Sequence, residues 1–125
     1  MDLYREELMD IYRNPSNKGK IDDPTVAVDK KNPMCGDEIH LQLKFRDNVV
    51  EDAKFDGSAC AVSIIASSML TEMIIGKNLS ELKSITKDDL LASMGLNLTT
   101  SRVKCATLVL DALQGALEIY DGKEN

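Results

Sequence analysis

Three cysteines and one aspartate are the residues of this sequence whose types and positions best suit chemistry. Cys35 lies in a turn at residues 32–37, and the carboxylate of Asp37 follows it by two positions. Cys60 and Cys105 each lie near the start of a helical pattern later in the chain. A thiolate is both a nucleophile and a soft metal ligand, so thiols gathered by the fold could act as nucleophiles or bind a metal.

The spacing of the three thiols leaves a simpler explanation open. Cys60 follows Cys35 by 25 residues and Cys105 follows Cys60 by 45, unlike the short Cys-x-x-Cys pairs of zinc ribbons. Cysteine is among the most buried residue types, so Cys60 and Cys105 could each be core filler, whereas Cys35 lies in a polar turn. The start of a helix favours the thiolate form, and Arg102 and Lys104 add positive charge beside Cys105.

The composition favours one acidic domain. The chain has 125 residues, 43% of them hydrophobic, which predicts a single domain over residues 1–125 with an ordinary core. Its net charge of −6 argues against binding nucleic acid or an anionic membrane and favours a partner with a basic surface. Acidic residues near the N-terminus do not fit a signal peptide, so we expect a cytoplasmic protein with reduced thiols.

A period-2 pattern predicts three strands in an antiparallel meander. The clearest covers residues 39–45 and turns His40, the only histidine, away from its apolar face. We expect His40 to face solvent or a partner rather than a metal. A β-prone segment at residues 25–28 precedes it, and a strand over residues 49–56 follows. That last strand is predicted to place these residues on one face: Val49, Glu51, Ala53 and Phe55.

Helical periodicity predicts helices on one face of this sheet. The predicted helices cover residues 3–13, residues from Cys60 to a stop at Gly76, residues 79–85, and residues after a capping box at 86–89 up to Gly95. A last, long helix is expected to begin after an N-cap at Ser101 and to end before a frayed tail at residues 121–125. The predicted class is α+β: a three-stranded antiparallel sheet with helices packed on one face, including an N-terminal and a long C-terminal helix.

Four separated motifs include the three cysteines and their neighbours. They are residues 12–19, residues 32–37, residues 55–63 with 66–69 and 76–77, and residues 102–108. They are spread from residue 12 to residue 108, so the match runs over nearly the whole length of the chain. In this order they resemble the U-type iron–sulfur cluster assembly proteins, the IscU/SufU group that also forms the N-terminal domain of NifU.

The resemblance implies a scaffold protein rather than an enzyme. Such a scaffold receives sulfur from a pyridoxal-phosphate-dependent cysteine desulfurase, builds a labile [2Fe-2S] cluster and transfers it to apo-proteins. Carried over residue by residue, the resemblance makes Cys35, Asp37, Cys60 and Cys105 the candidate ligands, with Cys35 or Cys105 as the first persulfide acceptor. A carboxylate is a harder and weaker partner for this chemistry than a thiolate, so we expect Asp37 to ease cluster release.

The sequence departs from both branches of this family. IscU proteins carry a histidine before the third cysteine and a Leu-Pro-Pro-Val-Lys motif before that; here Lys104 and residues 98–102 stand instead. A lysine is charged near pH 7, so Lys104 is expected to be a counter-charge rather than a ligand. Residues 102–105 resemble SufU, in which the same four groups can hold zinc, but the SufU insertion between the second and third cysteines is absent.

Two alternatives to the cluster scaffold therefore stay open. One is a zinc-dependent sulfur acceptor that activates its desulfurase. The other is a structural or adaptor domain with buried, unreactive thiols. Whether two chains share one cluster as a homodimer is also open.

Overall fold

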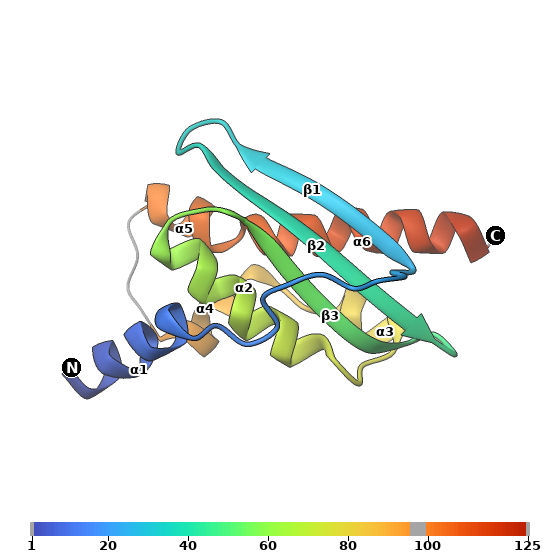
Figure 1. The fold of residues 1–125 in the computed structure, drawn as a ribbon, viewed down its shortest axis with the longest axis horizontal. Helices are drawn as coiled ribbons and strands as arrows, with labels where there is room; N and C mark the ends of the chain where they lie inside the picture. The colour runs from blue at the N-terminus through green and yellow to red at the C-terminus, as the bar shows by residue number, and fades with distance from the viewer. Residues whose placement is uncertain (1, 96–99, 125) are drawn as a thin grey trace.

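A three-stranded antiparallel sheet forms one layer of the molecule and helices form the other (Figure 1). The structure, a computed structural model, describes the backbone of residues 2–95 and 100–124. Its strands lie side by side in chain order as β1 (Val26–Asn32), β2 (Asp37–Arg46) and β3 (Val49–Ser58). Each strand pairs antiparallel with the next, so the predicted meander and the α+β class are confirmed.

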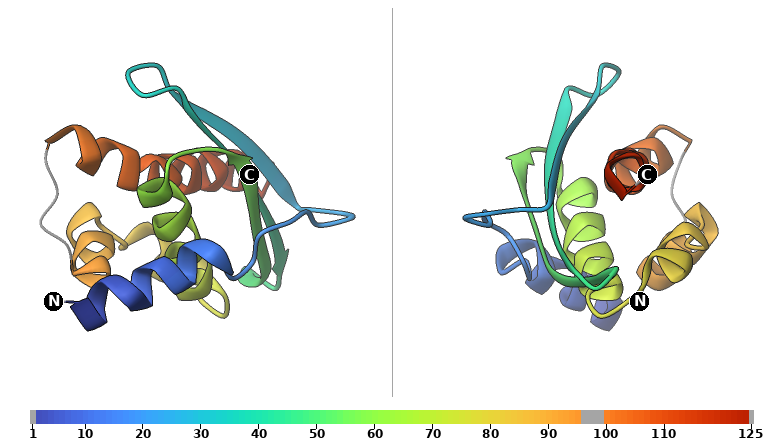
Figure 2. Two further views of the ribbon diagram at one scale, coloured as in Figure 1. Left: turned by 60° about the vertical axis from the view of Figure 1, so that its left-hand side comes forward. Right: turned by 90° about the vertical axis from the view of Figure 1, so that its right-hand side faces the viewer.

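The helices of the described residues pack around one face of this sheet. They are α1 (Asp2–Arg13), α2 (Ala61–Ile74), α3 (Leu79–Lys83), α4 (Lys87–Met94), α5 (Thr100–Ala106) and α6 (Leu108–Glu124). Helix α2 packs against β3, while α6 crosses β1 and β2, and Figure 2 shows both helices on the same side of the sheet. Helices α1 and α4 pack against α2. The predicted N-terminal and long C-terminal helices are thus present.

The apolar face of β2 is the centre of the core. Buried and half-buried residues alternate along this strand, and Ile39, Leu41 and Leu43 are fully buried. Leu70 of α2 and Leu113 of α6 are fully buried in the same cluster. Burying one such side chain contributes about 1.5–3 kcal/mol, so this packing fixes the sheet against the two helices.

The start of β3 differs from the predicted alternation because the strand contains a bulge. Lys44 pairs with Asp52, but the next residue, Phe45, pairs with Val50, so Glu51 is an extra residue in β3. Val50 is buried and Glu51 is exposed. The prediction that Glu51 lies on the same face as Ala53 and Phe55 is therefore wrong, and Val50 is buried with them instead.

Strand β1 is longer than the predicted segment at residues 25–28. Its charged residues 29–31 continue the ladder by pairing with residues 38–40 of β2, and Asn32 pairs with Asp37. Strand pairing satisfies backbone N–H and C=O groups whatever the polarity of the side chains. A search for alternating apolar residues therefore does not detect this charged part of the strand. As a result, the turn that carries Cys35 is the tip of a β-hairpin.

The predicted last helix is in fact two helices. Helix α5 ends at Ala106 and α6 begins at Leu108, with a turn at Thr107 between them. The hydroxyl oxygen of Ser63 in α2 lies 2.8 Å from the carbonyl oxygen of Cys105, and a side chain inserted into a helical ladder is a known cause of such breaks. The start and the end also differ from the prediction, because α5 begins before Ser101 and α6 continues to Glu124.

The predicted boundaries of α4 are confirmed. Thr86 and Asp89 form a capping box in which each side chain accepts from the other residue's backbone N–H. Gly95 ends the helix with a left-handed φ of 66°. Helix α3 has an equivalent box, formed by Asn78 and Glu81, that the sequence analysis did not identify.

The segment that follows α1 lies along the outer edge of β3. The N–H of Gly19 donates to the carbonyl of Phe55 at 2.8 Å, and the N–H of Phe55 donates to the carbonyl of Asn17 at 2.9 Å. The N–H of Ser16 also donates to the hydroxyl of Ser68 in α2, at 2.8 Å. Residues 16–19 are thus fastened to both the sheet and α2.

None of the helices in the described part of the chain combines the length and the apolar composition needed to cross a membrane.

The fold predicts that Gly57 cannot be replaced without loss of stability. Its φ is 138°, and a Cβ at this position would lie 2.1 Å from the carbonyl oxygen of Glu38 on the paired strand. We expect Gly57→Ala to lower the free energy of unfolding by about 2–4 kcal/mol in a urea titration. The matched control is Gly122→Ala in α6, where a Cβ meets nothing within 4 Å; it should instead raise stability by about 0.5–1 kcal/mol. An unchanged unfolding midpoint for Gly57→Ala would contradict the strand geometry.

Candidate metal centre

Cys35 lies at the hairpin tip in a turn that Asn32 organises. The side-chain oxygen of Asn32 accepts from the N–H of Met34 at 3.0 Å, and its carbonyl accepts from the N–H of Gly36 at 2.8 Å. Gly36 has a φ of 76°, a left-handed conformation that glycine adopts without a steric penalty. The turn leaves Cys35 exposed to solvent.

Asp37 is the first residue of β2 and is buried. Its Oδ1 accepts from the backbone N–H of Cys60 at 3.0 Å, and its Oδ2 lies 2.6 Å from the Ser63 hydroxyl. Burial raises the pKa of the Asp37 carboxyl, but hydrogen bonds from Ser63, Cys60 and Cys35 outweigh it, so the pKa lies below its ordinary value. Asp37 is therefore a carboxylate at neutral pH.

Cys60 is the N-cap residue of α2, as the sequence predicts. Its thiol is half-buried, and its Sγ lies 3.7 Å from the Ser63 hydroxyl oxygen. Its backbone N–H is the group that Asp37 holds. Cys60 therefore links the start of α2 to the start of β2.

Cys105 lies near the end of α5, not in the first turns of a long helix, so that prediction is wrong. Its side chain is buried, and its Sγ lies 3.2 Å from the Sγ of Cys35. Burial, the hydrogen bond with Cys35 and the negative charge of Cys60 raise the pKa of the Cys105 thiol to about 12. Arg102 and Lys104 were expected to lower this pKa by favouring the thiolate. They do not offset the increase, because both side chains are exposed while the thiol is desolvated.

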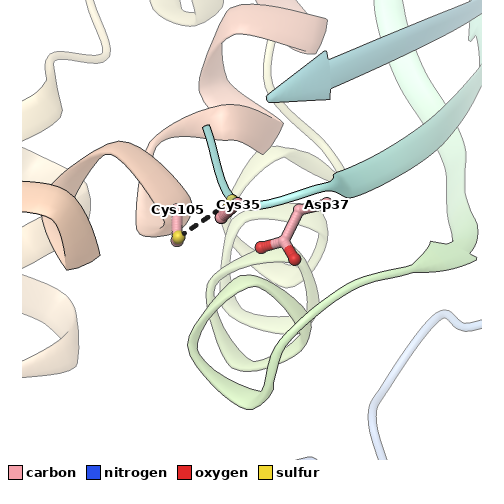
Figure 3. Close-up of side chains that lie close together, drawn as sticks. All are labelled: Cys35, Asp37 and Cys105. Atoms are coloured by element: carbon pink, nitrogen blue, oxygen red, sulfur yellow. Dashed lines mark hydrogen bonds between the residues drawn. The ribbon is translucent and has the colours of Figure 1, made fainter. Parts of the chain in front are cut away.

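Three of the four candidate ligands come together in one group. One ligand atom each from Cys35, Asp37 and Cys105 lies within 4.8 Å of the others, and Figure 3 shows the hairpin tip facing α5. Within the described residues, Cys60 is not a member of this group. It borders the group, because it interacts electrostatically with Cys105 and its sulfur lies 3.7 Å from the Ser63 hydroxyl oxygen.

The geometry of this group suits a soft cation. Tetrahedral zinc binds thiolate sulfur at about 2.3 Å, which puts two bound sulfurs roughly 3.8 Å apart. The sulfurs of Cys35 and Cys105 would need to separate by only about 0.6 Å from their present 3.2 Å. Thiolates with one carboxylate suit zinc or iron, so the residues fit the metals that the family resemblance implies. A cation bound there would also deprotonate the Cys105 thiol.

Lys104 lies beside this group in a hollow at the hairpin tip. The lining includes Lys31, Met34, Lys87 and Lys104, together with Asp111 of α6. Met34 is 84% exposed. The surface next to the thiols thus contains three lysines, although the whole chain is acidic.

His40 lies outside the group, as expected. Its ring Nδ1 bonds to the carboxylate of Asp29, and its Nε2 lies 3.6 Å from a carboxylate oxygen of Glu38. The side chain is 43% exposed, in agreement with the prediction of a residue near solvent.

Ser63 is the residue of this centre that the sequence analysis overlooked. It is 1% exposed and touches Asp37, Cys60 and Cys105 through one hydroxyl oxygen. Its position three residues after Cys60 puts both on one face of α2, which was the available signal.

The chain belongs to the family of the NifU-like N-terminal domain, whose model matches residues 3–125. This family comprises the IscU/SufU-type scaffolds of iron–sulfur cluster assembly, as the sequence motifs predict.

Individual relatives come from both branches. The chain is 37% identical to the zinc-dependent sulfurtransferase SufU of Bacillus subtilis, over 96% of this chain and 92% of that protein. It is 35% identical to the iron–sulfur cluster assembly scaffold protein IscU of Escherichia coli K12, over 96% of this chain and 95% of that one. Among solved structures, a proposed SUF-system scaffold protein from Fervidobacterium islandicum superposes with a TM-score of 0.77 at 28% identity, covering 90% of this chain and 94% of that chain.

The burial of the thiols predicts how fast each one reacts. In metal-free protein at pH 7.5, exposed Cys35 should be alkylated first and buried Cys105 last, at least about 100-fold more slowly. Because the pKa of Cys105 is about 12, its rate should still rise about tenfold per pH unit between pH 8 and 10. Mass spectrometry after timed iodoacetamide treatment measures each site. Equal rates at the two cysteines would contradict the described burial.

Proposed function

We propose that this protein is a scaffold on which a labile [2Fe-2S] cluster is assembled, with residues 1–125 acting as one domain. Cys35, Asp37, Cys60 and Cys105 are its ligands in this proposal, and the cluster is cargo that passes to apo-proteins. The observation that carries the proposal is the meeting of Cys35, Asp37 and Cys105 within 4.8 Å, in a chain of this family.

Asp37 is the ligand that favours release. Both of its carboxylate oxygens already accept hydrogen bonds, one from the Cys60 N–H and one from Ser63. Iron in clusters prefers thiolate to carboxylate, so Asp37 is the weakest of the four proposed ligands. A permanent electron-transfer centre would be better served by a fourth cysteine.

Cys35 is the better candidate for first sulfur acceptor. It is exposed at the hairpin tip, whereas Cys105 is buried behind it. The Cys35 thiolate attacks the outer sulfur of a persulfide on the desulfurase, that S–S bond breaks, and the desulfurase cysteine leaves as a thiolate. The sulfur passes at the sulfane level, so the step needs no added oxidant or reductant.

The hollow beside Cys35 supports docking of an acidic segment of the desulfurase. Its lysines, Lys31, Lys87 and Lys104, share the hollow with Met34, the chain neighbour of Cys35. The net charge of −6 alone predicts a basic partner, but charges near the thiols act on the approaching segment more strongly than distant ones.

A second candidate function is a zinc-dependent sulfur acceptor that accelerates its desulfurase. It is favoured by the 37% identity to the zinc-dependent sulfurtransferase of Bacillus subtilis and by Lys104 in place of the IscU histidine. Metal analysis of the isolated protein, with desulfurase turnover measured before and after chelation, separates the two. Tightly bound zinc that iron never displaces would rule out the scaffold.

The scaffold proposal predicts which side chains are needed for a cluster. Anaerobic reconstitution with iron and sulfide should give a visible absorption band, and Cys→Ser changes at Cys35, Cys60 and Cys105 should each remove it. His40→Ala is the matched control and should retain the band, because His40 lies outside the ligand group. Retention of the absorption band in all three serine variants would contradict the scaffold proposal.

Replacing the weak ligand should change the rate of release. We expect Asp37→Ala to slow transfer of a preformed cluster to an apo-ferredoxin by about tenfold, a barrier increase of about 1.4 kcal/mol. Glu72→Ala removes an exposed acid from α2 and should leave the rate unchanged. Transfer followed by circular dichroism measures both. An unchanged rate in Asp37→Ala refutes the role given to this carboxylate.

A further inference from the structure

We propose that Ser63 is a positioning residue that couples the carboxylate of Asp37 to the segment carrying Cys105. The inference rests on the proposed use of Asp37 and Cys105 as ligands. The Ser63 hydroxyl oxygen lies 2.6 Å from Asp37 Oδ2 and 2.8 Å from the carbonyl oxygen of Cys105. One buried atom of α2 thus joins the start of β2 to the end of α5.

A hydrogen count shows why this contact is unusual. A hydroxyl has one hydrogen to donate, while a carboxylate and a carbonyl are acceptors only. Ser63 can therefore satisfy Asp37 or Cys105 at any one moment, but not both. The bond to the carboxylate is charge-assisted and is the stronger of the two, so it holds the hydrogen while Asp37 is free of a cation.

The second acceptor lies at a structurally sensitive point. In an unbroken α-helix the carbonyl of Cys105 would accept from the N–H of residue 109. Here it faces Ser63, directly before the turn at Thr107 that separates α5 from α6. A bond at this carbonyl fixes the end of α5, and hence the direction in which the Cys105 thiol points toward Cys35.

The Ser63 hydroxyl therefore changes its hydrogen-bond partner when Asp37 binds a cation. When the carboxylate gives electron density to a cation, its Oδ2 becomes a weaker acceptor, and the Ser63 hydroxyl can rotate toward the Cys105 carbonyl. Ligation by Asp37 then steadies Cys105, and loss of Asp37 from the metal loosens Cys105 in turn. Ser63 makes two separate ligands act together in binding and release.

Helix α2 offers a matched control one turn further on. Ser67 is fully buried, like Ser63, but its hydroxyl donates to the carbonyl of Ser63 within the same helix, at 2.7 Å. Ser67→Ala removes a buried hydroxyl of the same kind without touching Asp37 or Cys105. Ser63→Thr restores a hydroxyl at the position under test.

The test is a Co²⁺ titration of metal-free protein, with affinity from chelator competition and geometry from the thiolate charge-transfer and d–d absorption bands. Ser63→Ala should weaken Co²⁺ binding about 10–100-fold and shift the d–d bands. Ser67→Ala should stay within about twofold of wild type, and Ser63→Thr should recover most of the loss. Thermal unfolding of each metal-free variant shows whether a loss of fold explains any change.

A double-mutant cycle separates coupling from a merely structural role. In an Asp37→Ala background the Ser63 hydroxyl has no carboxylate to serve and can bond to the Cys105 carbonyl at all times, so Ser63→Ala should change Co²⁺ affinity by a different amount there than in the wild-type background, and the difference measures the coupling. Wild-type affinity and bands in Ser63→Ala, or an equal loss in both backgrounds, would overturn the inference while leaving the scaffold proposal intact. If the wild-type protein binds no Co²⁺ through its cysteines, the scaffold proposal and this inference fall together.

Discussion

The buried carboxylate of Asp37 is the interaction on which the centre depends. It receives the N–H of Cys60 and the hydroxyl of Ser63, and so ties the first residue of β2 to the first turn of α2. An ionised group is tolerated in a buried position only when hydrogen bonds replace its lost hydration. The same bonds that make the charge tolerable also set the distance between the hairpin tip and α2. Structure and reactivity at this site therefore cannot be varied independently.

The thiols around this carboxylate differ in exposure, and that difference divides their tasks. Cys35 lies in solvent at the hairpin tip, Cys60 is half-buried and Cys105 is buried. An exposed thiol suits the exchange of sulfur with another protein, and a desolvated one suits a bond to a metal that displaces its proton. In the proposed scaffold, this gradient would let sulfur enter at Cys35 while Cys105 holds the metal.

Much of this arrangement could be predicted from the sequence. The alternation in β2, the start of α2 at Cys60 and the cap at Thr86 are local signals, and each is confirmed. The errors arise where contacts between distant segments decide the outcome. The extra residue at Glu51 reflects pairing with β2, and the break at Thr107 reflects the hydroxyl of Ser63. Cys35 and Cys105 lie 70 residues apart in the chain, and the prediction that they come together rested on the family resemblance and not on their spacing.

The short segment along β3 has a consequence for self-association. An uncovered strand edge presents unpaired N–H and C=O groups to which a second chain can add. Residues 17–19 occupy those groups at Phe55, so two copies cannot join their sheets through the middle of β3. The opposite edge of the sheet, on β1, carries charged side chains at residues 29–31. Charged side chains on an edge strand disfavour the addition of a second chain, because they repel like charges and hold water. A family motif that contains none of the candidate ligands thus covers one edge of the sheet, while Cys35 at the hairpin tip stays exposed.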